Sequence, residues 1–494
     1  MAADREKPNI LLIMPDQLRA DFLGCYGAAF ARTPNLDRLA ASGRQYKNAI
    51  SPHPLCVPAR AALLTGHNAV STGVLSNGSW LRPDHAACGM PTIAEILADN
   101  GYLTAAFGKM HFMPWDIAEG FRIRRIAEDK RHVYIEDDYH DYLASVGFAK
   151  SRGPDEEGYA ENLMASFDAL PPELQVDSWV ADETVRFIRR HGGRGEPFFA
   201  MVGFPGPHDP YNPPKAWTED WDPSSMPESH PPTEATETFR QGQIRQNRLG
   251  SASINMEYFP EDVKRRVRIH YSALTSNIDA GIGRVLAALD DRGLNRNTVV
   301  IATSDHGDLL GDFGLLGKNN FLEPSIRIPL IVRAPGIGPA GCSGALVTLT
   351  DLFATIAEFA GIETSGRGDS IALPELGLVQ RRAREVVLGA LGSGFMMTDG
   401  RYKLARYANG LATLSDRVAD PAEQSNLLDR PDAADVALRL DAAMTRELLD
   451  ALFEGNVEKG YDYATMDPAH PSHQRGWSRP YPISEPPRRE VQPI

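Results

Sequence analysis

Asn9-Ile-Leu-Leu-Ile-Met14, followed at once by Pro15-Asp16-Gln17, is the stretch that most clearly indicates the fold. An apolar run of this length that ends at a turn is typical of a strand buried on both faces of a sheet. Comparable runs recur at residues 103–107, 197–202, 298–303 and 328–333. Segments with helical periodicity lie between them, at residues 34–42, 92–100, 179–191 and 261–289. This alternation predicts an α/β fold in which a large, mostly parallel sheet is sandwiched by helices.

The C-terminal part of the chain has a different pattern. After about Arg384, short apolar runs at residues 386–391, 395–398 and 401–407 are joined by tight turns, and a helix is expected over residues 433–452. The Asp399-Gly400 turn is typical of antiparallel strands. We therefore expect an α/β domain over residues 1–384, a small antiparallel sheet with one helix over residues 385–460, and an extended Pro- and Arg-rich tail over residues 461–494. The tail is either disordered or an arm on a neighbouring subunit, and it favours a homo-oligomer.

Composition and charge exclude several functional classes. The 494 residues are 42% hydrophobic and 23% charged, which excludes a disordered chain, a coiled coil and a collagen-like repeat. With 51 Lys and Arg against 65 Asp and Glu, the net charge is −14, so we expect no nucleic acid and no membrane as a partner. We expect neither a secretory leader nor a membrane span, and the four cysteines are too few for a disulfide framework. These features predict a cytoplasmic protein.

Polar residues follow two of the predicted strands. Asp16 and Gln17 come after the first strand, and Asp305 and His306 come after the strand that ends at Thr303. Taken singly, each is more often a turn or helix-cap residue. Ligands of α/β sheets, however, bind beyond the carboxyl ends of the strands, so two such pairs favour a common site. Two carboxylates, an amide oxygen and an imidazole would suit a divalent cation.

A second motif is Cys56-Val57-Pro58-Ala59-Arg60. Pro58 fits the first turn of a helix that runs through Leu64. Cys56 then lies at the helix N-terminus, where unpaired N–H groups favour an anion, and Arg60 lies one turn along. A buried structural cysteine is the alternative interpretation.

Three further motifs carry basic residues. They are Gly108-Lys109-Met110-His111, Gly206-Pro207-His208-Asp209-Pro210 and Gly317-Lys318. Taken singly, each lysine is a solvated surface charge. If they converge near the cation, two lysines, two histidines and Arg60 would form a pocket for a tetrahedral oxyanion.

These motifs together resemble those of a known family. Cys56-Val57-Pro58-Ala59-Arg60 resembles the C-x-P-S/A-R signature of type I sulfatases, in the alkaline phosphatase superfamily, and residues 101–111 resemble the second signature of that family. Further matches follow in family order at residues 23–27, 304–307, 420–421 and 426–427. The resemblance implies an alkaline phosphatase-like fold and a hydrolase that cleaves a small-molecule sulfate monoester, aryl sulfates among the candidates.

The resemblance also implies roles for the site residues. Cys56 would be oxidised by a separate formylglycine-generating enzyme to Cα-formylglycine, and Arg60 would steady the hydrated aldehyde. One divalent cation would be held by the oxygen derived from Cys56 together with Asp16, Gln17, Asp305 and His306. The sulfate would be bound, and the leaving oxygen protonated, by Lys109, His111, His208 and Lys318.

Four residues depart from the family pattern. Val57 and Phe107 are larger than usual, and Gln17 and His306 stand where many sulfatases carry Asp and Asn. Gln17 with His306 resembles the metal shell of phosphonate monoester hydrolases. We expect Ca²⁺, with Mn²⁺ as the alternative because an imidazole suits a transition ion better. The Lys109 and His111 pair favours a sulfatase. The alternatives are a phosphonate monoester or phosphodiester hydrolase on the same scaffold, and an unmodified, non-catalytic protein that binds an oxyanion or a metal.

The sequence does not identify the alcohol that the sulfate ester would release. The long, Pro-rich stretches at residues 115–175 and 208–260 are expected to wall the pocket. Aryl, steroid, choline and carbohydrate sulfates all remain candidates. One basic cluster would suit an anionic sugar, but we interpret it as a solvated face: Arg122, Arg124, Arg125, Lys130 and Arg131.

Overall fold

The computed structural model describes residues 7–86, 88–193, 195–249, 254–338, 340–364, 368–379 and 383–456. The expected tail at residues 461–494, and the last residues of the expected small subdomain, lie outside these ranges. Within them, no helix has both the length and the apolar composition needed to cross a bilayer.

The main sheet has eight strands in the order β4-β3-β5-β1-β6-β7-β2-β8. Their bounds are β1 Asn9–Ile13, β2 Arg44–Ile50, β3 Leu103–Gly108, β4 Ile123–Ile126, β5 Phe198–Gly203, β6 Thr298–Thr303, β7 Leu330–Arg333 and β8 Gly341–Thr348. All neighbours are parallel except at β7, which runs antiparallel to both β6 and β2. The prediction of a mostly parallel sheet is therefore confirmed.

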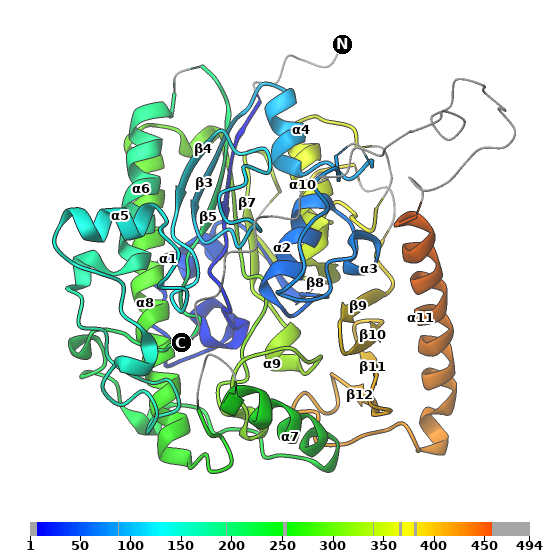
Figure 1. The fold of residues 1–494 in the computed structure, drawn as a ribbon. Coiled ribbons are helices and arrows are strands. Elements are labelled where there is room, and N and C mark those ends of the chain that lie inside the picture. The colour runs from blue at the N-terminus through cyan, green and yellow to red at the C-terminus, as the bar shows by residue number, and fades with distance from the viewer. Residues whose placement is uncertain are drawn as a thin grey trace, which may run out of the picture.

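Helices cover both faces of this sheet (Figure 1). One face packs against α1 Pro34–Ala41, α5 Asp138–Ser145, α6 Val176–His191 and α8 Glu261–Asp291, and the other against α2 Cys56–Thr65, α4 Ile93–Asp99 and α10 Leu352–Phe359. Alternate residues of β1 point to opposite faces. Accordingly Leu11 packs with Ile282 of α8, whereas Leu12 packs in the core that contains Leu63 of α2.

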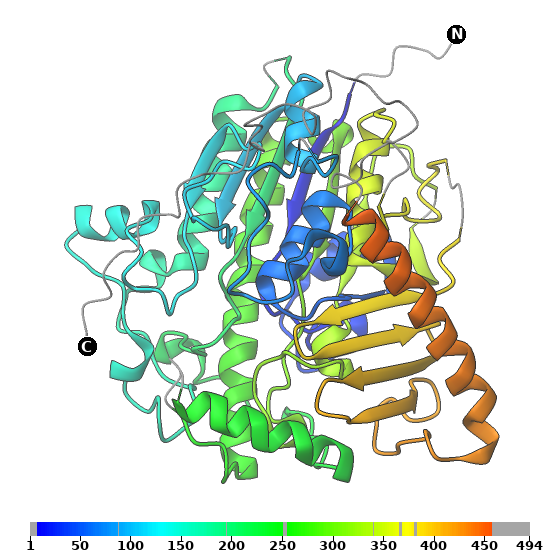
Figure 2. The same ribbon diagram turned by 45° about the vertical axis from the view of Figure 1, so that its right-hand side comes forward.

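A smaller antiparallel sheet follows in the order β12-β11-β10-β9 (Figure 2). Its elements are β9 Val387–Leu391, β10 Gly394–Thr398, β11 Tyr402–Tyr407, β12 Ala412–Asp416 and the helix α11 Ala434–Glu454. One face packs on α11 through Met397 and Leu440, and the other packs on the main domain through Met396 and Phe321. The antiparallel sheet and its helix were predicted, but β12 was not.

Several further elements were absent from the sequence prediction. They include β2, β4, β8, α5 and α10, together with the helices α3 Ala69–Thr72, α7 Glu234–Leu249 and α9 Glu323–Ile326. Of these, β4 matters most for function, because it pairs in parallel with β3 at the edge of the sheet. The carboxyl ends of β4, β3, β5, β1 and β6 therefore open onto the same side, where the polar motifs collect.

Candidate active site

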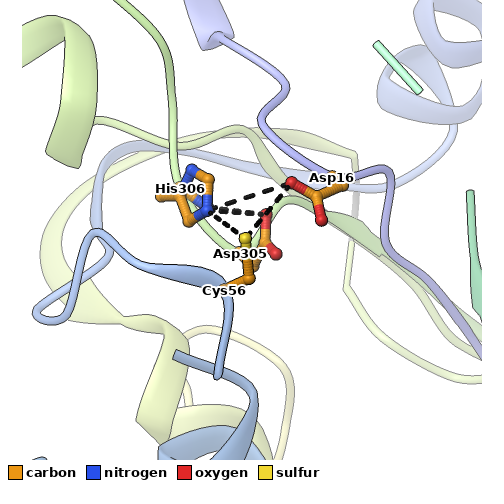
Figure 3. Close-up of side chains that lie close together, drawn as sticks. All are labelled: Asp16, Cys56, Asp305 and His306. Carbon is orange, nitrogen blue, oxygen red and sulfur yellow. Dashed lines mark hydrogen bonds and ion pairs between the residues drawn. The ribbon is translucent and has the colours of Figure 1, made fainter. Parts of the chain in front are cut away.

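The loops after β1 and β6 bring Asp16, Asp305 and His306 to the sulfur of Cys56 (Figure 3). The potential ligand atoms of these four buried residues all lie within 4.8 Å of one another. Sγ of Cys56 is 3.3 Å from Nε2 of His306 and 3.8 Å from Oδ1 of Asp16. Two carboxylates, one imidazole and the group at position 56 form a donor set that suits a divalent cation.

The orientation of His306 supports this role. Its Nδ1 lies 3.0 Å from the backbone oxygen of Gly307, so Nδ1 carries the hydrogen and donates it. Nε2 is left as the lone-pair atom that faces Cys56. A hydrogen bond from the other ring nitrogen to a backbone carbonyl is the usual way in which a ligating histidine is held.

Gln17, the fifth residue expected at the cation, has a different set of partners. Its backbone lies in the left-handed region, with φ of 70°, and its backbone N–H donates to Asp305 over 3.0 Å. The side-chain oxygen accepts a hydrogen bond from Lys318, and the side-chain nitrogen donates to Asp308. Gln17 therefore lies between the carboxylates and the basic residues of the site.

Helix α2 positions both Cys56 and Arg60. The helix begins at Cys56 and is buried along its whole length. The Arg60 guanidinium lies 3.0 Å from Oδ2 of Asp305 and 3.4 Å from Oδ2 of Asp16, and it also donates to the backbone oxygen of Lys109. A buried guanidinium that contacts both carboxylates fixes their positions and offsets their charge.

The loop after β3 carries Lys109 and His111. Nζ of Lys109 lies 2.6 Å from Asp16, 2.9 Å from Asp129 and 4.0 Å from Sγ of Cys56. Burial lowers the pKa of Lys109, but the charges of Asp129 and Asp16 outweigh it and hold the pKa above its usual value. His111 has a left-handed backbone with φ of 58°, and its buried Nδ1 has no hydrogen-bond partner among the described residues.

The electrostatics favour an anion at position 56. Burial alone raises the pKa of the Cys56 thiol, but the nearby charges of Lys109 and Lys318 hold that pKa well below its usual value. The same field would stabilise any anionic oxygen that took the place of the sulfur.

His208, in the loop after β5, lies between two cations. Its Nε2 is 2.7 Å from Nζ of Lys318 and 3.2 Å from the Arg131 guanidinium, while Nδ1 is 2.6 Å from the backbone oxygen of Asp209. Lysine and arginine only donate, so Nε2 accepts and Nδ1 carries the hydrogen. Lys318 therefore holds the proton of this pair.

The structure corrects one interpretation and adds residues that the sequence did not suggest. Arg131 and Lys130 do not lie on a solvated face. Arg131 contacts Asp129 over 2.8 Å as well as His208, and the Lys130 ammonium donates to the backbone oxygen of Pro210. The buried Asp129 joins Lys109 to Arg131. Recognising β4 would have revealed these residues, because they follow its carboxyl end.

The site can therefore bind a divalent cation and, next to it, a tetrahedral oxyanion. Two carboxylates and an imidazole can hold a divalent cation against the group at position 56. Next to them, buried or half-buried cationic side chains can hold a tetrahedral oxyanion: Arg60, Lys109, Arg131 and Lys318.

Comparison with known proteins identifies relatives over nearly the whole chain. The family model described as Sulfatase matches residues 8–362. An arylsulfatase of Clostridium perfringens is 29% identical over 488 residues, which cover 93% of this chain and 99% of that protein. A choline-sulfatase of Rhizobium meliloti is 30% identical over 86% of this chain and 83% of that protein.

Solved structures share the fold at lower identity. The phosphonate monoester hydrolase of Agrobacterium radiobacter aligns with a TM-score of 0.76 at 23% identity, over 91% of this chain and 96% of its own. A 2-O GAG sulfatase aligns with a TM-score of 0.69, also at 23% identity, over 94% of this chain and 96% of its own.

Proposed function

The chain belongs to the sulfatase family, with an alkaline phosphatase-like fold, and we propose that it hydrolyses sulfate monoesters of small molecules through a nucleophile derived from Cys56. The observation that carries the proposal is the convergence of Asp16, Asp305 and His306 on Cys56, next to buried cations. Carboxylates around a cation and lysines around an oxyanion are what sulfate transfer requires at one site.

We propose one divalent cation, Ca²⁺ with Mn²⁺ as the alternative. Asp16, Asp305 and His306 would hold it, and Gln17 would join them if its side-chain oxygen turned from Lys318. When bound, such a cation lowers the pKa of a hydroxyl at position 56 and offsets the charge of the sulfate. The carboxylates provide hard oxygen ligands for Ca²⁺, whereas the imidazole suits Mn²⁺ better.

We further propose that Cys56 is converted to formylglycine by a maturation enzyme. A hydrated aldehyde supplies two hydroxyls on one carbon, one to attack sulfur and one whose deprotonation releases sulfate and restores the aldehyde. A serine has no second hydroxyl, so water would have to cleave its sulfate ester. The field that lowers the pKa of the Cys56 thiol would equally favour an anionic oxygen there.

The remaining residues bind and move protons. Arg60 orients the group at position 56 through its contacts to Asp16 and Asp305. Lys109 and Lys318 bind sulfate oxygens. Lys318 also delivers a proton to the departing alcohol, since it holds the proton of the Lys318–His208 pair. We assign to His111, whose side chain interacts with Cys56, the proton that is released at position 56.

The test is a comparison of kcat/KM for a sulfate monoester and a phosphonate monoester with the same leaving group. We expect a preference for the sulfate. A strong preference for the phosphonate would overturn the assignment in favour of the hydrolases that share the fold. Cys56→Ala is expected to abolish hydrolysis, and unchanged hydrolysis in that variant would contradict the proposed nucleophile.

A further inference from the structure

Asp308, in the loop after β6, is a fully buried carboxylate beside the site, and none of the roles proposed above uses it. Its Oδ1 accepts from two backbone N–H groups, that of Leu310 over 3.0 Å and that of Gly317 over 2.8 Å. Its Oδ2 accepts from the side-chain nitrogen of Gln17 and, over 2.6 Å, from the hydroxyl of Tyr211. Asp308 therefore joins the loops that follow β1, β5 and β6.

The orientation of the Gln17 amide decides what this side chain offers to the site. Its nitrogen donates to Asp308 and, over 3.4 Å, to Asp209, while its oxygen accepts from Nζ of Lys318. A carboxylate only accepts hydrogen bonds and an ammonium only donates them. An amide turned by half a rotation would therefore be mismatched at all three contacts, with its oxygen against two carboxylates and its hydrogens against Lys318.

Building on the proposed function, in which Gln17 and Lys318 act side by side, we propose that Asp308 is a positioning residue for the Gln17 amide. By holding the amide nitrogen, it keeps the amide oxygen on the side of Lys318, as the atom that is available to the divalent cation. An amide that turned would present hydrogens to the cation instead. Hydrogen-bond partners that orient a metal ligand typically contribute about 10- to 100-fold to metal affinity or activity.

Asp308→Asn changes this one contact selectively. An asparagine has a single accepting oxygen, and the backbone N–H groups of Leu310 and Gly317 can only donate, so that oxygen stays with them. The new amide nitrogen then faces the nitrogen of Gln17, and two donors meet. Gln17 must either lose this hydrogen bond or turn its oxygen away from Lys318. The loop that carries Lys318 meanwhile keeps its own hydrogen bonds to position 308.

The test is a double-mutant cycle of Asp308→Asn with Gln17→Met, a side chain of similar length that has no amide to orient. Calorimetry on the chelator-treated full chain measures the dissociation constants of Ca²⁺ and Mn²⁺, so this readout does not depend on turnover. The value of kcat/KM for a sulfate ester is measured alongside. Tyr211→Phe is the matched control, because it removes another hydrogen bond to Oδ2 of Asp308 and leaves the Gln17 contact in place.

We expect Asp308→Asn to weaken cation binding and to lower kcat/KM by about 10- to 100-fold in the parent chain. In the Gln17→Met background the same change should alter cation binding by less than about 3-fold, because Asp308 acts through the missing amide. Tyr211→Phe should bind the cation within about 3-fold of the parent.

An equal loss of cation affinity in both backgrounds would show that Asp308 does not act through Gln17, and would overturn the proposal. The same holds if Asp308→Asn binds the cation as the parent does, or if Tyr211→Phe loses as much affinity as Asp308→Asn. A parent chain that binds neither cation would overturn the proposed function as well, so the two failures are distinguishable.

Urea unfolding of the metal-free chain shows whether each variant folds. If Asp308→Asn alone does not fold, Gln17→Glu tests the same contact from its other side. Gln17→Glu places a buried carboxylate oxygen against Asp308, so it should lower the free energy of unfolding. Adding Asp308→Asn should raise that free energy again, because the asparagine amide donates to the new carboxylate. A double variant no more stable than Gln17→Glu alone would overturn the proposal.

Discussion

Nζ of Lys109 lies 2.6 Å from Oδ2 of Asp16. This ion pair joins a carboxylate that would hold the divalent metal ion to a lysine that would bind the sulfate. Asp129 contacts the same ammonium from the other side and continues the chain of charges to Arg131. The two halves of the site are therefore one buried network, and removing a member should affect both.

Lys109→Met tests this connection. The change removes the ammonium and keeps a side chain of similar length, so Asp16 and Asp129 lose a buried partner. We expect kcat/KM for a sulfate ester to fall by about 100-fold or more, and urea unfolding to show a loss of roughly 3–5 kcal/mol. Lys109→Arg keeps the charge and should retain most of the stability. A Met variant with activity within about 3-fold of the parent would contradict this account.

Replacing His306 should change the metal selectivity of the site formed by Asp16, Asp305 and His306. His306→Asn replaces an imidazole by an amide oxygen, which Ca²⁺ prefers over Mn²⁺, so the ratio of the two dissociation constants should shift toward Ca²⁺ on the order of tenfold. Calorimetry on the chelator-treated chain measures both constants. For the parent chain, a cation at 100 times its Kd should stabilise the fold by about 2.7 kcal/mol against heat. Equal cation selectivity in parent and variant would argue against ligation by His306.

Arg131 should matter for catalysis although its side chain reaches the surface. Arg131→Met removes the guanidinium that donates to both Asp129 and His208, so we expect kcat/KM to fall roughly 10- to 100-fold. Arg131→Lys should restore only part of the lost activity. Nε and Nη2 of Arg131 both donate to the carboxylate of Asp129, and a single ammonium cannot make the same pair of hydrogen bonds. Arg122→Met is the control, since that side chain is 62% exposed. The same activity in the Arg122 and Arg131 variants would show that Arg131 has no role in the site.

The contact between the main domain and the small sheet should weaken in acid. The buried His53 accepts from the backbone N–H of Ala69 and contacts the backbone oxygen of Ala390 in β9, and burial lowers its pKa from 6.5 to about 4. Between these values the unfolded chain binds a proton that the folded chain does not, so stability falls as the pH falls. The loss from His53 is at most about 3 kcal/mol.

Urea unfolding at pH 7 and pH 5 measures this effect. His53→Gln removes the titration, so the variant should lose less stability between the two pH values than the parent does, even if it is less stable at pH 7. An identical pH dependence in parent and variant would mean that His53 does not titrate in this range.

Burial explains why part of this molecule is predictable from its sequence. The strands β1, β5 and β6 are covered on both faces, so their residues form continuous apolar runs. Because β1 and β6 pair in parallel, with Ile13 opposite Ala302, the residues that follow them come together. The proximity of Asp16 and Asp305 was predictable for that reason.

The sequence analysis missed β4 and the site residues that follow it, and this also has a physical cause. The strand β4 has only four residues, Ile123–Ile126, and two of them are arginines, so it shows no buried apolar run. Asp129 and Arg131 follow this strand and were missed with it. The orientation of Gln17 toward Lys318 and Asp308 depends on side-chain hydrogen bonds between distant loops, which a sequence pattern does not report.

The central claim is that Cys56 is converted to an aldehyde, and that the hydrate of this aldehyde is the nucleophile of a sulfate ester hydrolase. The most direct test is the mass of the tryptic peptide of residues 48–60, taken from protein purified out of its own host and shown to hydrolyse a sulfate ester. We predict that this peptide has lost one sulfur and two hydrogens and gained one oxygen, or carries the hydrate of that aldehyde. An unmodified thiol at position 56 in the active protein would contradict the claim.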